Sequence, residues 1–262
     1  MSADAAPASK TVGGYSYFVV WFLAIVYTLN FLDRQIISIL GKQISAELHL
    51  TKTQFGLLGG TSFALLYTTC GIGVAYLADR MSRKWIIAVA CAIWSLFTAL
   101  AGLAQGFWSL LAARPFVAAG EATLVPTASN IILARVDDRH KAGALGLFFA
   151  GIPLGIGGGF LIAGLLGPIL GWRGTFLLMG ALGIIALSAL VRLRDDPPDL
   201  SHQPTLAGNL AALFALYRAV PRALWASLAI IAAHAHTATG AFVQLWLTSE
   251  KGLDPATARA TY

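Results

Sequence analysis

The chain has 262 residues, of which 57% are hydrophobic and only 11% carry a full charge, and its formal net charge is +6. A soluble domain carries about 25% charged residues, so this composition argues against a soluble globular protein. The positive charge does not indicate nucleic-acid binding, because the basic residues gather in a few links between apolar segments and form no long basic run.

Seven long apolar segments follow one another along the chain. A bilayer core of about 30 Å needs about 20 helical residues to cross it, and each segment approaches or exceeds this length. We expect transmembrane helices at residues 15–40, 53–78, 85–104, 107–134, 142–166, 174–193 and 222–248. The sequence therefore predicts an all-α integral membrane protein.

The links between these spans carry local signals. Thr51 is followed three residues later by Gln54, a capping-box pattern that predicts a helix start. A short turn is expected at 168–173. The two cysteines, Cys70 and Cys91, lie inside apolar segments without the spacing of metal ligands or a disulfide framework, and we predict no cofactor and no metal site.

The distribution of Lys and Arg predicts the orientation. These residues concentrate in the links after the second, fourth and sixth spans, whereas the links after the third and fifth contain at most one. Cytoplasmic loops are enriched in Lys and Arg, so we expect these three links and the N-terminus to be cytoplasmic. A multi-pass protein of the plasma membrane or the bacterial inner membrane is the predicted localisation.

The end of the sequence indicates an internal repeat. Leu253-Asp254 follows the seventh span much as Leu50-Thr51 follows the first, each at a predicted helix start. This fits a two-fold repeat of six-helix halves, and we expect most of a C-terminal half to be missing. The predicted parts are a disordered cytoplasmic tail at 1–14, a six-helix bundle at 15–194, an inter-half loop with a candidate amphipathic helix at 195–221, and the seventh helix with the start of an eighth at 222–262.

Four ionisable residues lie well inside predicted spans: Asp33 and Arg34 in the first, and Arg114 and Glu121 in the fourth. A charge at the bilayer centre costs about 2.5 kcal/mol or more, so such residues face the bundle interior, pair with one another, and often mark a substrate or proton pathway. We interpret them as proton-coupling or substrate-binding residues. The alternative is a buried ion pair that only fixes helix packing.

Depth along the helices refines this interpretation. Asp33 and Arg114 are both expected about 10 Å below the outer boundary, where they could meet across two helices, while Glu121 lies about two turns deeper. Desolvation favours the neutral form of a carboxyl group, so Glu121 or Asp33 is expected to exchange protons. Arg114 or Arg34 is expected to attract an anionic substrate group. Arg34 cannot face the same way as Asp33, because adjacent helical residues diverge by about 100°.

Other polar residues in the spans are candidates for lining a cavity: Tyr27, Asn30, His234 and His236. An interhelical hydrogen bond explains Tyr27 and Asn30 equally well. The two histidines are two positions apart and point to nearly opposite faces of a helix, so at most one would face a cavity. Small residues in the glycine-rich fifth span are expected to let helices approach closely.

The link at 75–84 reads Ala-Tyr-Leu-Ala-Asp-Arg-Met-Ser-Arg-Lys. It resembles the Gly-x-Leu-Ala-Asp-Arg-x-Gly-Arg-Lys signature between the second and third helices of the major facilitator superfamily, with Ala75 and Ser82 in place of the glycines. The resemblance implies a cytoplasmic gating role for the four charged residues Asp79, Arg80, Arg83 and Lys84. An ordinary positively charged loop would explain the bases but less easily Asp79.

Two further motifs resemble the spinster-like subfamily: Leu-Asn-Phe-Leu-Asp-Arg at 29–34, and Arg114-Pro115 with Gly120-Glu121-Ala122. The resemblance implies a bundle of two six-helix halves, of which this sequence holds the first half and one helix of the second. It also implies alternating access around a mid-membrane site.

We therefore expect a proton-coupled secondary transporter, in contact with the lipid bilayer, that moves an amphipathic organic anion or a lysolipid-like substrate. A membrane-embedded enzyme would need a His-Asp or metal-ligand constellation, and His234-x-His236 has no acidic residue nearby. A seven-helix receptor conflicts with the predicted cytoplasmic N-terminus. We accordingly expect no enzyme activity.

Overall fold

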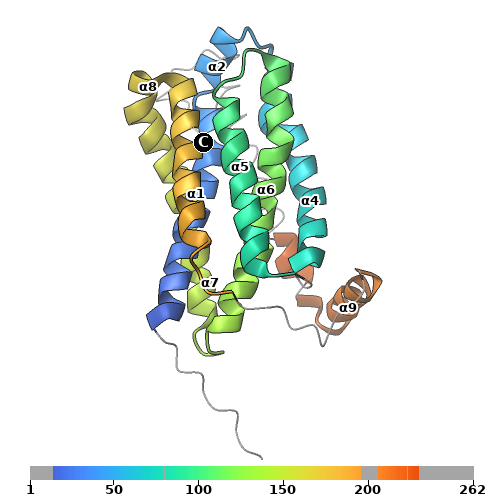
Figure 1. Ribbon diagram of the computed structural model, residues 1–262. Helices are drawn as coiled ribbons and strands as arrows, with labels where there is room; N and C mark the ends of the chain where they lie inside the picture. The colour runs from blue at the N-terminus through green and yellow to red at the C-terminus, as the bar shows by residue number, and fades with distance from the viewer. Residues whose placement is uncertain (1–13, 79–80, 196–205, 223, 230–262) are drawn as a thin grey trace, which may run out of the picture. The chain divides into compact units, whose positions relative to one another are not determined.

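The computed structural model describes residues 14–78, 81–195, 206–222 and 224–229, and within these ranges the regular structure is entirely helical (Figure 1). The chain divides into two compact units, Met1–Ser201 and His202–Tyr262, which are taken separately below. In the second unit, α9 (Leu206–Ala219) occupies the position of the predicted amphipathic helix. Its predicted place on the membrane surface stays a prediction.

The first span is α1 (Gly14–Ile39), which is followed by the short helix α2 (Gly41–Glu47). Buried residues recur along α1 every three or four positions, at Val19, Leu23, Val26, Asn30 and Asp33. This spacing is that of one helix face. The face that turns into the bundle therefore carries polar residues among its apolar ones.

The second span is built from three consecutive segments: α3 (Lys52–Gly56), the π-helical turn η1 (Leu57–Thr61) and α4 (Ser62–Ala78). The predicted capping box is confirmed, because the Thr51 hydroxyl accepts from the Gln54 backbone N–H at 3.2 Å and the Gln54 side chain accepts from the Thr51 N–H at 2.9 Å. The sequence signals did not predict the π-helical turn.

The third and fourth spans are α5 (Arg83–Ala101) and α6 (Phe107–Arg135), close to the predicted limits. The fifth and sixth are formed by α7 (Lys141–Phe149) and α8 (Gly151–Leu190). Figure 1 shows α8 reversing direction, and the reversal falls at Gly171, whose φ of 64° and ψ of 179° are not helical. The predicted turn at 168–173 is thus narrower than expected, because the helix continues past Pro168 and a single glycine in left-handed backbone breaks it.

Within the described part of the chain, four helical segments are long and apolar enough to cross a membrane: Gly14–Ile39, Arg83–Ala101, Phe107–Arg135 and Lys141–Leu190. The last of these contains both predicted spans on either side of Gly171. Large apolar side chains also remain on outward faces, which water would penalise and lipid accepts. They include Trp21, Ile25, Trp108, Leu161, Leu165, Ile169 and Ile185.

Glycines allow close packing between α1 and α8 and between α5 and α8. A Cβ atom added to Gly155 would lie 2.6 Å from the Thr28 carbonyl oxygen of α1. A Cβ added to Gly180 would lie 2.7 Å from the Ser95 carbonyl oxygen of α5. The absence of a side chain at these glycines is what lets the backbones approach. Close approach at Gly155 was predicted for the glycine-rich fifth span, whereas Gly180 lies in the sixth span, for which no such prediction was made.

Candidate functional site

The four predicted charged residues lie in the interior of the bundle, on α1 and α6. Asp33 is 6% exposed, Arg114 is 3% exposed and Glu121 is fully buried. The Arg34 side chain is 24% exposed. Arg114 and Glu121 are seven positions apart, so they share one buried stripe of α6.

The central contact is an ion pair between Arg34 and Glu121. Arg34 donates from Nη2 and from Nε to the same carboxylate oxygen, Oε2, at 2.9 and 3.1 Å. The other oxygen, Oε1, is buried and has no hydrogen-bond partner in the part of the chain that the structure describes. Oε2 of the buried carboxylate is thus paired with a cation. Oε1 can bind a proton or accept a hydrogen bond without displacing an existing partner.

Aromatic rings surround the two arginines. The Arg34 guanidinium carbon lies 4.8 Å from the ring centre of Phe31, 5.1 Å from that of Phe63 and 4.5 Å from that of Tyr67. The Arg114 guanidinium carbon lies 4.6 Å from the centre of the Phe63 ring. Phe63 belongs to α4, and its ring therefore contacts both cations. Such rings stabilise a cation in an apolar setting. The site therefore joins α1, α4 and α6.

Asp33 and Arg114 do not form the contact expected from their depth, since the ion pairs among the described residues do not include them. Asp33 accepts a hydrogen bond from the Thr98 hydroxyl of α5 at 2.6 Å. Arg114 Nε donates to the Leu58 carbonyl oxygen, in the π-helical turn, at 3.2 Å. Depth along a helix fixes only the height of a residue, and it did not predict which hydrogen-bond partner each of the two groups takes.

Asn30 is one helical turn before Arg34 and is completely buried. Neither its amide nitrogen nor its amide oxygen has a hydrogen-bond partner among the described residues. A buried polar group in that state costs about 1–3 kcal/mol, and such groups are normally satisfied by water or a ligand. Tyr27 is also buried and stacks on Phe148 with ring centres 4.4 Å apart.

The remaining predicted residues are distributed as follows. Arg83 and Lys84 occupy the first turn of α5, whose N-cap is Ser82. The Ser82 hydroxyl donates to Asp195 at 2.6 Å. Asp79, Arg80, His234 and His236 lie outside the described residues.

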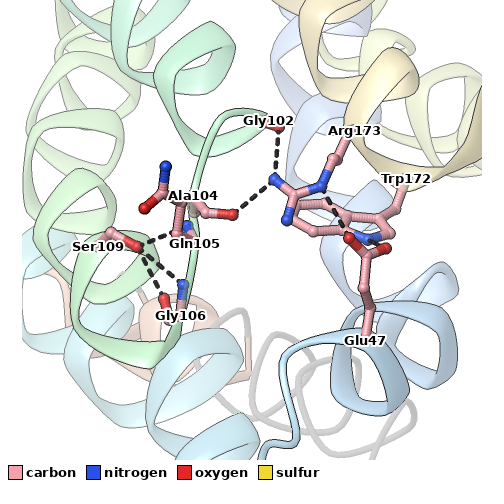
Figure 2. Close-up of polar contacts among 8 residues, drawn as sticks. All are labelled: Glu47, Gly102, Ala104, Gln105, Gly106, Ser109, Trp172 and Arg173. Carbon is pink, nitrogen blue, oxygen red and sulfur yellow. Dashed lines mark hydrogen bonds and ion pairs between the residues drawn. The ribbon is translucent and has the colours of Figure 1, made fainter.

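A polar cluster at the end of the bundle near α2 escaped the sequence analysis. Figure 2 shows Glu47 accepting from Trp172 Nε1 at 2.6 Å and from Arg173 Nε at 2.9 Å. Arg173 Nη1 also donates to the carbonyl oxygens of Gly102, at 3.2 Å, and Ala104, at 2.6 Å. The hydrogen bonds from Trp172 and then Arg173 hold the pKa of Glu47 below its usual range. The hydrogen bonds of this cluster connect three parts of the chain that are far apart in the sequence: Glu47, the link that contains Gly102 and Ala104, and the turn at Trp172 and Arg173.

The family model of the Major Facilitator Superfamily matches residues 23–262. An MFS-type efflux pump of Mycolicibacterium smegmatis is 35% identical over 174 residues, covering 66% of this chain and 40% of that protein. Protein spinster of Drosophila melanogaster is 30% identical over 187 residues, covering 71% of this chain and 31% of that protein. A hexuronate transporter of Bacillus subtilis is 32% identical over 167 residues, covering 64% of this chain and 39% of that protein.

The fold is also similar to solved structures. A bacterial homolog of the human lysosomal transporter Spinster, in an inward-facing and unoccupied conformation, matches with a TM-score of 0.71 and 30% identity. That match covers 96% of this chain and 59% of the solved chain. The chain thus spans less than half the length of the curated relatives named above.

Proposed function

The chain belongs to the major facilitator superfamily and is spinster-like, and we propose that it forms part of a secondary transporter in which Glu121 couples protons to an anionic substrate. The observation that carries this proposal is the one-sided ion pair. Glu121 is fully buried, neutralises Arg34 through one oxygen, and has its other oxygen without a partner among the described residues.

The coupling follows from what protonation does to Arg34. A neutral Glu121 leaves a largely buried guanidinium without its counter-ion, and losing one partner of a buried pair costs about 3–5 kcal/mol. A substrate anion bound to Arg34 replaces the lost counter-ion and restores the balance of charge around the guanidinium. Proton binding at Glu121 and anion binding at Arg34 therefore favour each other, and this favourable coupling is reciprocal.

The substrate class follows from the walls of the site. Two arginines supply positive charge, and the rings of Phe31, Phe63 and Tyr67 supply apolar surface next to it. We therefore propose an amphipathic organic anion, with a carboxylate or phosphate group at Arg34 and an apolar part against the rings. The relative named for hexuronate carries the name of an organic acid, which supports an anion.

The test uses the full-length protein in liposomes. Radiolabelled glucuronate and a lysophospholipid are supplied one at a time, with and without a pH gradient. Glu121→Gln keeps the shape of the side chain and removes its ability to exchange a proton. We expect gradient-driven accumulation to fall at least tenfold while substrate exchange without a gradient continues.

The matched control is Asp138→Asn, which neutralises an exposed carboxylate bound to Lys141 in the link before α7. It should leave accumulation within twofold of the unmodified protein. Undiminished accumulation by Glu121→Gln would show that the ion pair only fixes helix packing.

A further inference from the structure

A small pocket with strong positive charge lies where α5 begins, α6 ends and the chain leaves α8. Four basic residues line it: Arg83, Lys84, Arg135 and Arg194. Its other lining residues are the apolar Ile87, Ile131, Ala134 and Leu193. The pocket is therefore cationic with an apolar base, and no carboxylate is among the described residues that line it.

Several contacts hold these cations in place. Arg135 Nη2 donates to the backbone oxygen of Arg194 at 2.8 Å, and the Arg194 backbone N–H donates to the Tyr15 hydroxyl at 2.7 Å. The Tyr15 ring lies 5.7 Å from the guanidinium of Arg135 and 5.0 Å from that of Arg194. Arg83 Nε is buried and has no hydrogen-bond partner among the described residues. A cluster of like charges held together in this way attracts an anion.

The surroundings of the pocket point to the membrane interface. Trp85 is 50% exposed beside Lys84, whose ammonium lies 5.1 Å from the indole ring, and Met81 is 53% exposed. Tryptophan and tyrosine are enriched at the level of lipid headgroups. An apolar surface next to a cationic pocket suits a ligand whose phosphate is attached to acyl chains.

We propose that this pocket binds the phosphate group of an anionic lipid headgroup, of the phosphatidylglycerol class. Basic pockets between transmembrane helices on the cytoplasmic side bind such headgroups, and the Lys and Arg pattern places this end of the bundle in the cytoplasm. Because the pocket has room for only about one water molecule, the phosphate lies over its mouth against the basic side chains, and the acyl chains lie outside against Trp85. The site is separate from Glu121, since Arg135 lies about 21 Å further along α6 at 1.5 Å per residue.

The experiment measures lipid binding to the full-length protein in neutral detergent by native mass spectrometry. Phosphatidylglycerol is titrated against phosphatidylcholine with the same acyl chains, and sn-glycerol 3-phosphate serves as the free phosphate. The test variant combines Lys84→Gln with Arg194→Gln. Arg194 makes its hydrogen bonds to Tyr15 and Arg135 through its backbone, so these contacts survive the change.

The matched control combines Arg139→Gln with Arg192→Gln, two exposed arginines outside the pocket, and removes the same total charge. We expect the dissociation constant for phosphatidylglycerol to rise at least tenfold in the test variant and to change less than twofold in the control. A second test variant, Arg83→Gln, should weaken binding in the same direction.

Three results would overturn the proposal. Equal weakening in the test and control variants would mean that net charge alone attracts the lipid. Unchanged binding in both test variants would remove the pocket from the lipid site. If sn-glycerol 3-phosphate bound as tightly as phosphatidylglycerol, the phosphate site would stand but its lipid assignment would fail.

Discussion

Asp33 and Glu121 show how neighbouring buried carboxylates take different partners. Glu121 pairs with a guanidinium, whereas Asp33 accepts from the hydroxyl of Thr98. A hydroxyl can serve either protonation state of its partner, whereas a guanidinium pairs with the charged form alone. At the scale of single residues, Glu121 is therefore the group whose protonation changes the balance of charge around Arg34.

The stability of the protein should reflect the dependence of Arg34 and Glu121 on each other. Removing either partner leaves the other buried and uncompensated, at a cost of about 3–5 kcal/mol, while removing both restores neutrality. We expect Arg34→Gln to lower the thermal-unfolding midpoint of the purified protein more than the double variant with Glu121→Gln does. A loss in the double variant equal to the sum of the losses in Arg34→Gln and Glu121→Gln alone would show that the two side chains do not interact.

The candidate site could be predicted from the sequence as a set of residues but not as a set of contacts. Charged residues are rare inside apolar spans, so the positions of Asp33, Arg34, Arg114 and Glu121 within such spans were enough to select them. Their pairing depends on the rotation of α1 against α6 and on the rings of Phe63 and Tyr67, which come from another helix. Helix rotation is set by packing, and a single sequence records it only weakly.

At the scale of elements, the glycine seam between α1 and α8 determines how closely two spans approach. A methyl group at Gly155 would meet the Thr28 carbonyl oxygen at 2.6 Å, whereas one at Gly157 of the same helix would have nothing within 4 Å. We expect Gly155→Ala to destabilise the protein by about 1–3 kcal/mol through overpacking. Gly157→Ala should be neutral or stabilising by up to about 1 kcal/mol, because alanine favours a helix.

Thermal unfolding of the two alanine variants in one detergent measures this difference. Similar midpoints for the two variants would contradict a tight seam at Gly155. The glycine-rich span was recognisable from the sequence, but the glycines that contact α1 were not, since the contact depends on which face of α8 turns inward.

The Glu47 cluster predicts a dependence of stability on acid pH. The pKa of Glu47 is lowered in the folded protein. The stabilisation is therefore fully present above the unfolded-state pKa of about 4.3, and it is lost as the pH falls through the lower folded-state pKa. We expect the unfolding midpoint of the unmodified protein to exceed that of Glu47→Gln at pH 7. The difference should shrink as the pH falls below about 4.

A difference between the two proteins that stays constant from pH 7 to pH 3 would contradict this role for Glu47. The Glu47 cluster could not be predicted from the sequence, because its members come from three links and meet only when the bundle is assembled (Figure 2).

At the scale of the whole molecule, the helical topology was the most predictable property. A membrane demands long apolar segments, so the limits of α1, α5 and α6 fall within a few residues of those expected. The π-helical turn at Leu57–Thr61 and the single-residue break at Gly171 were not predictable from apolar length. The chain spans less than half the length of the curated relatives named above, so the transport proposed here is to be measured on the full-length protein.

The proposed transport mechanism couples proton movement to anion movement at Glu121. The most direct measurement is substrate-evoked proton flux in liposomes that contain the full-length protein and a pH-sensitive dye. Addition of the transported anion should move protons in the unmodified protein, and in Glu121→Gln the anion should still exchange while the proton signal disappears. A proton signal that persists unchanged in Glu121→Gln would show that Glu121 is not the coupling group and that another residue couples the two movements.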